Sequence, residues 1–278
     1  GNSDTHYSDV AVILDKDGTL VECNESITDE IKDKLVSLLE NRVNVVILTG
    51  GILDHSLESF IIPLEREIML RGKMSFFPYL RYYFMSGNGM VSWNISGDRK
   101  IEYCAEKYSE KDKHAIMLSL ALAFFEVAKE KSGIEPNDFG SRILSASTSE
   151  EIQRIFSDYI SFYKDRFGEI TINNGGDRLI VLELKNSALR QAKPEFQNID
   201  FVAMVHKRFQ DFIRSESFDV DFVHPYGATF VTCNIRDKER TLMEFMAEKE
   251  FVNPFIVCVG DTATDYGFLG AKIHTGRK

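Results

Sequence analysis

The stretch AVILDKDGTL, residues 11–20, decides the fold class of this chain. A continuous apolar run from Val10 to Leu14 is typical of a strand covered on both faces, as in a parallel sheet. The run ends in two carboxylates, Asp15 and Asp17, which point to the same side of an extended backbone. Two like charges this close repel each other unless something nearby compensates them. We therefore expect a binding site where this strand ends.

Two further apolar strands end in polar residues. The run VNVVILTGG ends in Thr49 and Gly50, and the run FIVCVGD ends in Asp261, four residues before Asp265. A helix between the first two strands makes a parallel strand–helix–strand unit. The carboxyl ends of parallel strands share one edge, where ligands bind. The sequence thus predicts that acids far apart in the chain meet at one rim of an α/β sheet.

The middle of the chain has a different pattern. Capping-box patterns begin at Ser109, before a long apolar helix, and at Thr148, before a second helix; a strand and an amphipathic helix follow. We expect residues 106–222 to form an inserted α+β cap domain. Residues 1–105 and 223–278 would then form a discontinuous α/β core with a central parallel sheet.

The acids at the predicted rim favour a hard cation. Asp15, Asp17 and Asp261, with Asp265 nearby, offer only oxygen ligands, and no cysteine or histidine cluster has zinc spacing. Such a set favours Mg²⁺, which keeps several waters and takes a substrate phosphate oxygen. A carboxylate-bound metal beside an oxygen-binding crevice suits phosphoryl transfer.

Composition narrows the function class. A formal net charge of −10 over 278 residues argues against nucleic-acid binding, which needs a basic surface. No segment reaches the roughly 18 apolar residues needed to span a membrane, and the polar stretch at residues 1–9 has no signal-peptide pattern. Four widely spaced cysteines fit a reducing compartment. We expect a cytoplasmic protein, and its oligomeric state stays open.

Four motifs resemble those of the haloacid dehalogenase superfamily of phosphohydrolases. They are DKDGTL at 15–20, Thr49-Gly50, a helix-opening Lys238, and GDTATD at 260–265. SGNGM at 86–90 and the place of the insertion are similar to the Cof-like branch, which has a large α/β cap between the second and third motifs. The resemblance covers the core and implies a Rossmann-like fold of that type. The cap matches in placement and size only.

The resemblance implies a role for each residue at the rim. Asp15 would be the nucleophile that forms an aspartyl-phosphate, and Asp17 would protonate the leaving oxygen and then deprotonate water. Thr49 and the Gly50 N–H would hold the phosphoryl oxygens, and Lys238 would neutralise their charge.

The resemblance also implies a metal centre. Asp15, the backbone carbonyl of Asp17, and Asp261 would bind Mg²⁺, with Asp265 orienting the metal's ligands. Two positions depart from the common pattern. Gly51 stands where many relatives have Arg, and Thr264 stands where Asn is common. The pair Thr264-Asp265 resembles trehalose-phosphate phosphatases at this point.

We expect a Mg²⁺-dependent phosphatase whose substrate is a small phosphorylated metabolite, with a sugar phosphate favoured. The alternatives are a phosphomutase of the phosphomannomutase type, a trehalose-phosphate-phosphatase-like enzyme, and a catalytically silent binding protein. In the cap, NNGGDR at 173–178 reads first as a hairpin turn. It reads alternatively as a loop that brings Arg178 to the substrate.

Overall fold

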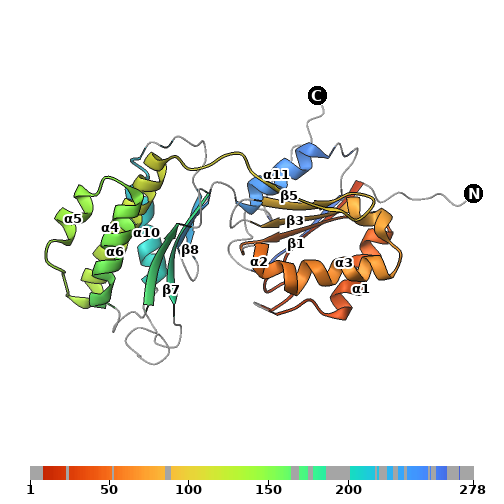
Figure 1. The fold of residues 1–278 in the computed structure, drawn as a ribbon, viewed down its shortest axis with the longest axis horizontal. Helices are drawn as coiled ribbons and strands as arrows, with labels where there is room; N and C mark the ends of the chain where they lie inside the picture. Colours follow the sequence, from red (N-terminus) through yellow and green to blue (C-terminus); the bar gives the residue numbers. More distant parts are fainter. Residues whose placement is uncertain are drawn as a thin grey trace, which may run out of the picture. The chain divides into compact units, whose positions relative to one another are not determined.

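The computed structural model divides the chain into two compact units (Figure 1). The first combines Gly1–Cys104 with Arg236–Lys278, and the second is Ala105–Ile235. The residues that the structure describes are 9–22, 25–51, 53–84, 89–163, 169–174, 178–185, 201–216, 218, 224–227, 231–234, 237–249, 251, 255–261 and 269.

The first unit contains a six-stranded sheet in the order β10-β1-β2-β3-β4-β5. Its strands are β1 (Val10–Asp15), β2 (Asn44–Thr49), β3 (Leu80–Phe84), β4 (Gly89–Trp93), β5 (Arg99–Tyr103) and β10 (Phe255–Val259). The four strands from β10 to β3 are parallel, whereas β4 and β5 add an antiparallel hairpin. The expected α/β class with a parallel centre is confirmed, and the last residues of β1, β2 and β10 lie along one edge.

The first unit also contains helical segments, several of which pack on the sheet (Figure 1). They are α1 (Asp29–Glu40), α2 (Leu53–Ser56), the π-helical turn η2 (Leu57–Ile61), α3 (Ile62–Leu70), the 3₁₀ segment η3 (Met74–Tyr79) and α11 (Lys238–Glu248). Helix α1 begins at Asp29, because the Thr28 hydroxyl accepts a hydrogen bond from the Ile31 N–H at 3.3 Å. Acidic residues in its first turn, Asp29 and Glu30, favour the same start.

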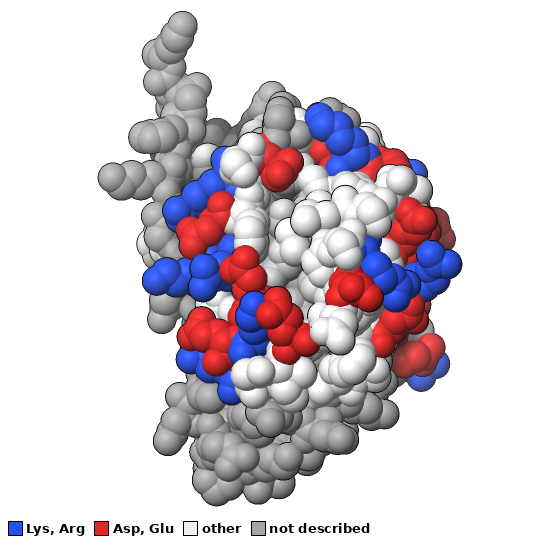
Figure 2. Space-filling view, turned by 90° about the vertical axis from the view of Figure 1, so that its left-hand side faces the viewer, with Lys and Arg blue, Asp and Glu red and all other residues white. Residues whose placement is uncertain are grey.

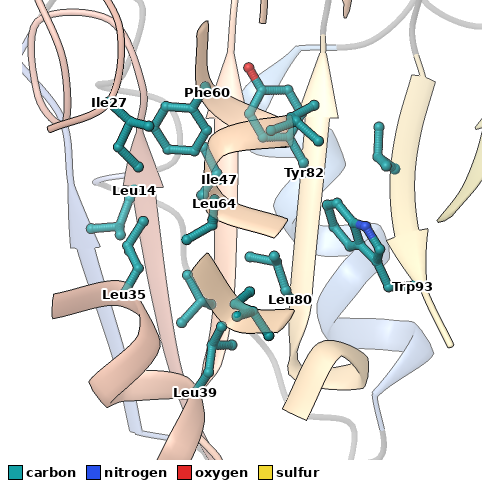
Figure 3. Packing of buried hydrophobic residues seen from close by; sticks show 14 of the residues in the cluster. Leu14, Ile27, Leu35, Leu39, Ile47, Phe60, Leu64, Leu80, Tyr82 and Trp93 are labelled. Atoms are coloured by element: carbon teal, nitrogen blue, oxygen red, sulfur yellow. The ribbon is translucent and has the colours of Figure 1, made fainter. Parts of the chain in front are cut away.

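Apolar side chains cover both faces of the parallel strands. Ile47 and Tyr82 belong to one buried cluster, shown in Figure 3, while Val46 and Tyr83 belong to a second cluster. Successive strand residues point to opposite faces, so a strand buried on both sides reads as a continuous apolar run. Burying one such side chain stabilises the fold by about 1.5–3 kcal/mol.

Strand β10 departs from this pattern because it lies at the sheet edge. Its alternate residues Phe255, Val257 and Val259 are exposed, whereas Ile256 and Cys258 pack against the second cluster. The apolar sequence of this strand therefore indicated more burial than it has.

A polar cluster ties the hairpin to the helices. Glu65 on α3 accepts hydrogen bonds from Trp93 Nε1 at 2.5 Å and from Arg99 Nε at 2.8 Å. Arg99 Nη2 also donates to the second carboxylate oxygen at 2.5 Å. Glu65 is buried, and this bidentate pairing satisfies its charge.

The second unit contains a four-stranded antiparallel sheet in the order β6-β7-β9-β8. Its elements are α4 (Glu110–Ser132), α5 (Phe139–Ser145), α6 (Ser149–Ile160), η4 (Ser161–Tyr163), β6 (Glu169–Asn174), β7 (Leu179–Lys185), α10 (Phe201–Ile213), β8 (His224–Gly227) and β9 (Val231–Asn234). The predicted capping box is present on α4, which ends at Gly133 in the left-handed conformation, with φ of 70°.

Residues 223–235 differ from the expectation. Strands β8 and β9 pair with each other, and β9 also pairs with β7, so both strands extend the sheet of the second unit. The second unit accordingly runs to Ile235 instead of ending at 222. A hairpin with one apolar face can extend either of two sheets, and its sequence pattern does not specify which.

Aromatic side chains pack against one another in the core of the second unit. Phe124 on α4 packs edge-on against Phe156, Tyr163 and Phe201, with ring centroids 5.3–6.0 Å apart. On the face drawn in Figure 2, acidic and basic side chains are interspersed around an uncharged area. Within the described ranges, no helix combines the length and apolar character needed to cross a membrane.

Candidate active site

The acidic motif forms a tight turn after β1. The Lys16 N–H donates to the Leu48 carbonyl of β2, and the N–H groups of Leu20 and Val21 both donate to the Lys16 carbonyl. Gly18 has φ of +88°, a conformation that disfavours any side chain. This turn fixes Asp15 at the end of the strand and Asp17 immediately beyond it.

Asp15 pairs with Lys238, which lies 223 positions later in the sequence. Lys238 Nζ lies 2.5 Å from Asp15 Oδ1, and the two residues are only 7% and 3% exposed. Lys238 is the first residue of α11, whose N-cap Asp237 accepts a hydrogen bond from the Arg240 N–H at 2.7 Å. The capped helix start therefore places the ammonium group at the carboxyl end of β1, as the third motif predicts.

Asp17 is held by two partners. Thr49 Oγ1 donates to Asp17 Oδ2 at 2.7 Å, and Lys16 Nζ lies 2.6 Å from Asp17 Oδ1. Thr49 is fully buried at the end of β2, and its hydroxyl accepts a hydrogen bond from the Gly51 N–H at 3.0 Å. Gly50, between them, is exposed. The predicted second motif thus contacts the first directly.

Asp261 reaches the same turn from β10. A Cβ atom built on Gly18 would lie 2.8 Å from Asp261 Cγ, so only glycine leaves room for this carboxylate. Asp265 lies outside the described residues. The structure therefore brings Asp15, Asp17, Thr49, Lys238 and Asp261 to one edge of the sheet.

The donor set fits a hard divalent cation in its chemistry. It offers carboxylate oxygens from Asp15, Asp17 and Asp261, and the two lysines do not fully offset three negative charges. In the described part of the chain, no three Asp, Glu, His or Cys side chains form a group that could hold an ion. The carboxylate of Asp15 instead pairs with Lys238, and that of Asp17 pairs with Lys16.

Lys16 and Tyr82 were not assigned a role from the sequence. Lys16 is 5% exposed, and its position inside the acidic motif was the available signal. Burial raises the pKa of the Tyr82 phenol, with further increases from the charges of Asp17 and Asp15. A tyrosine in an apolar strand reads as a core residue, so nothing in the sequence pointed to its hydroxyl.

Arg178 belongs to the second unit, whereas the residues described above belong to the first. It lies half-buried in the turn between β6 and β7, in the second unit. The hairpin that NNGGDR was first expected to make is present, since β6 and β7 pair antiparallel from Glu169–Lys185 to Asn174–Ile180.

Comparisons with known proteins find similarity in structure alone. No protein-family model matches the chain, and no curated protein matches it. An IMP-bound mutant of the IMP-nucleotidase of Plasmodium falciparum has a TM-score of 0.61 at 11% identity, covering 93% of this chain and 60% of that one. An N-terminally truncated, IMP-bound form of the same nucleotidase has a TM-score of 0.58 at 12% identity, covering 90% and 58%.

These similarities establish a shared fold. The chain spans about three fifths of the length of the nucleotidases it matches. A haloacid dehalogenase-like hydrolase from Bacteroides thetaiotaomicron has a TM-score of 0.42 at 13% identity, covering 92% of this chain and 83% of that one.

Proposed function

We propose that the chain is a Mg²⁺-dependent phosphatase of the haloacid dehalogenase superfamily, acting on a small phosphorylated metabolite. The observation that carries the proposal is the buried contact of 2.5 Å between Lys238 Nζ and Asp15 Oδ1. A carboxylate nucleophile can accept an anionic phosphate only where a cation offsets the combined negative charge. Lys238 supplies such a cation at the end of β1, where a second acid, Asp17, follows two residues after Asp15.

The reaction divides into two displacements. In the first, an Asp15 carboxylate oxygen bonds to phosphorus, the bond from phosphorus to the leaving oxygen breaks, and Asp17 gives that oxygen a proton. In the second, Asp17 takes a proton from water, the water oxygen bonds to phosphorus, and the bond to Asp15 breaks. Free phosphate leaves, and both carboxylates return to their starting states.

The phosphoryl oxygens would be held by groups at the end of β2. Thr49 and the Gly50 N–H are proposed to bind them, with Lys238 as the compensating cation. The Thr49 hydroxyl already contacts Asp17 at 2.7 Å, so the binding and proton-transfer groups adjoin.

Mg²⁺ would be bound by Asp15, the Asp17 carbonyl and Asp261, with Asp265 as an orienting acid. When bound, it neutralises and orients the phosphoryl oxygens. The support is the acidic edge itself, where Asp261 lies against Gly18 and leaves a net negative charge beside two lysines.

The substrate class includes sugar phosphates and nucleoside monophosphates. The two nucleotidase structures named above are IMP-bound, and for that reason nucleoside monophosphates are included. We propose the inserted domain, expected over 106–222 and of the Cof-like type, as the part that selects the substrate, with Arg178 as a contact. Cys104 and Cys258 form no disulfide within the described residues, which fits action in the cytoplasm.

Phosphate release from a panel of sugar phosphates, trehalose phosphate and nucleoside monophosphates, with Mg²⁺ or EDTA present, tests the proposal. We expect Mg²⁺-dependent release from at least one, and no release by Asp15→Asn. An isomerised sugar phosphate without phosphate release would indicate the phosphomutase. No turnover at any metal concentration, also with a chromogenic phosphate ester, would indicate a binding protein.

A further inference from the structure

Two buried hydroxyls behind Thr49 have no hydrogen-bond partner among the described residues. Tyr82 Oη and Ser56 Oγ are both fully enclosed, and each side chain is only 1% exposed. Leaving a buried hydroxyl unpaired costs about 1–3 kcal/mol, so native folds rarely retain one without a use. Phenylalanine at position 82 would fill the same space without that cost.

The two hydroxyls lie beside the candidate site. Tyr82 stands on β3 with its ring 5.9 Å from that of Phe60, and its oxygen points away from Leu80 and Leu39 (Figure 3). The Ser56 and Thr49 hydroxyls and the charges of Asp17 and Asp15 all act on the Tyr82 phenol, so they lie in its surroundings. The phenol thus faces the end of β2 from inside the core.

The Thr49 hydroxyl has room for one more donor. It donates its proton to Asp17 Oδ2 at 2.7 Å and accepts one hydrogen bond, from the Gly51 N–H at 3.0 Å. A hydroxyl has two acceptor lone pairs, so one can accept the phenol proton. That bond would fix the rotation of the Thr49 hydroxyl, with Ser56 Oγ steadying the phenol.

We propose that the Tyr82 and Ser56 hydroxyls position Thr49 and, through Thr49, the carboxylate of Asp17. The inference rests on the proposed function, in which Asp17 protonates the leaving oxygen. Tyr82 touches neither substrate nor reacting atoms in this scheme, and it is a positioning residue. Its loss would therefore matter most where the leaving oxygen needs that proton most.

The test compares two phosphate esters with Mg²⁺. An alkyl phosphate has a poor leaving group that depends on the acid, whereas p-nitrophenyl phosphate has a good one. Tyr82→Phe should lower kcat on the alkyl ester about tenfold or more, with KM changed less than about twofold, and should lower kcat on the nitrophenyl ester at most about threefold. The midpoint of thermal unfolding should stay or rise.

Two variants control for structural damage. Tyr83→Phe removes a hydroxyl from the neighbouring residue, whose side chain packs in the cluster on the other sheet face, and should leave both activities unchanged. In the Asp17→Asn background, Tyr82→Phe should add no further loss on the alkyl ester, because it acts through Asp17.

The outcomes separate the two proposals. Wild-type turnover of both esters with equal losses for Tyr82→Phe, or no loss, would overturn the positioning role and leave the phosphatase standing. A lower unfolding midpoint with equal losses would show that the hydroxyl supports the fold alone. Absence of wild-type turnover on either ester would overturn the phosphatase and this inference together.

Discussion

Lys238 Nζ lies 2.5 Å from Asp15 Oδ1, although 223 residues separate the two in the chain. Both side chains are buried, so neither charge is satisfied by bulk water. Removing one partner of such a pair leaves the other charged and buried, which typically costs about 3–5 kcal/mol. The contact consequently links the proposed chemistry to the stability of the first unit.

Asp15→Asn should abolish turnover, by about 10⁴-fold or more, while the protein stays folded. The amide oxygen can still accept a hydrogen bond from Lys238, but it cannot attack phosphorus. Phosphate release and circular dichroism check the two halves of this prediction. Wild-type activity in the variant would show that Asp15 is not the nucleophile.

Lys238→Met should lower turnover about 10²- to 10³-fold and destabilise the protein by about 3 kcal/mol, because Asp15 loses its buried cation. The double variant Asp15→Asn with Lys238→Met should recover most of that stability in urea unfolding. Arg240→Ala is the matched control, since Arg240 pairs with Glu244 at 3.1 Å on its own helix. A larger activity loss in Arg240→Ala than in Lys238→Met would show that Lys238 is not the cation of the third motif.

Lys16→Met should tighten Mg²⁺ binding roughly fivefold, because a positive charge beside Asp17 opposes a divalent cation by about 1 kcal/mol. Isothermal titration of Mg²⁺ measures the change. Lys32→Met, which removes an ammonium group paired with Asp29 on α1, should leave the affinity unchanged. Unchanged or weaker affinity in Lys16→Met would place the metal away from Asp17.

Glu65→Ala should destabilise the first unit by about 2 kcal/mol or more, since Trp93 and Arg99 both lose their acceptor. Trp93 is the single tryptophan of the chain, so its fluorescence follows this unfolding in urea. Glu67→Ala, which breaks a surface pair with Arg71, should cost no more than about 0.5 kcal/mol. Equal effects would mean that the cluster does not anchor the hairpin.

Cys258 should be alkylated slowly in the native protein. Burial raises the pKa of its thiol, so at any pH below that value less of it is thiolate, the reactive form. Iodoacetamide labelling at pH 8, followed by peptide mass spectrometry, should give a lower rate at Cys258 than in the urea-unfolded chain. The curve of rate against pH should move to higher pH on folding, and coinciding curves would contradict the shift.

The fold of the first unit could be predicted from the sequence because three apolar runs each end in polar residues. Such runs imply parallel strands, and parallel strands imply a shared edge, which is where Asp15, Asp17, Thr49 and Asp261 meet. Helix starts were predictable for a local reason, since capping hydroxyls act over three residues.

Other features depend on geometry that no local pattern encodes. The sheet that β8 and β9 join is decided by the pairing of β9 with β7, a choice between two distant partners. The ion pair of Lys16 follows from the turn at Gly18, and the place of the Tyr82 hydroxyl follows from the register of β3 on β2. The roles of Asp265 and Arg178 stay predictions.

The neighbouring strands β1 and β10 come from opposite ends of the printed sequence, with the whole second unit between them. On the ribosome, β1 emerges long before the strand and the lysine that complete its surroundings. The segment 105–235 is continuous and can collapse first. The nascent first unit keeps an unpaired strand edge until β10 emerges, and its chemistry becomes possible only after α11 and β10 have been translated.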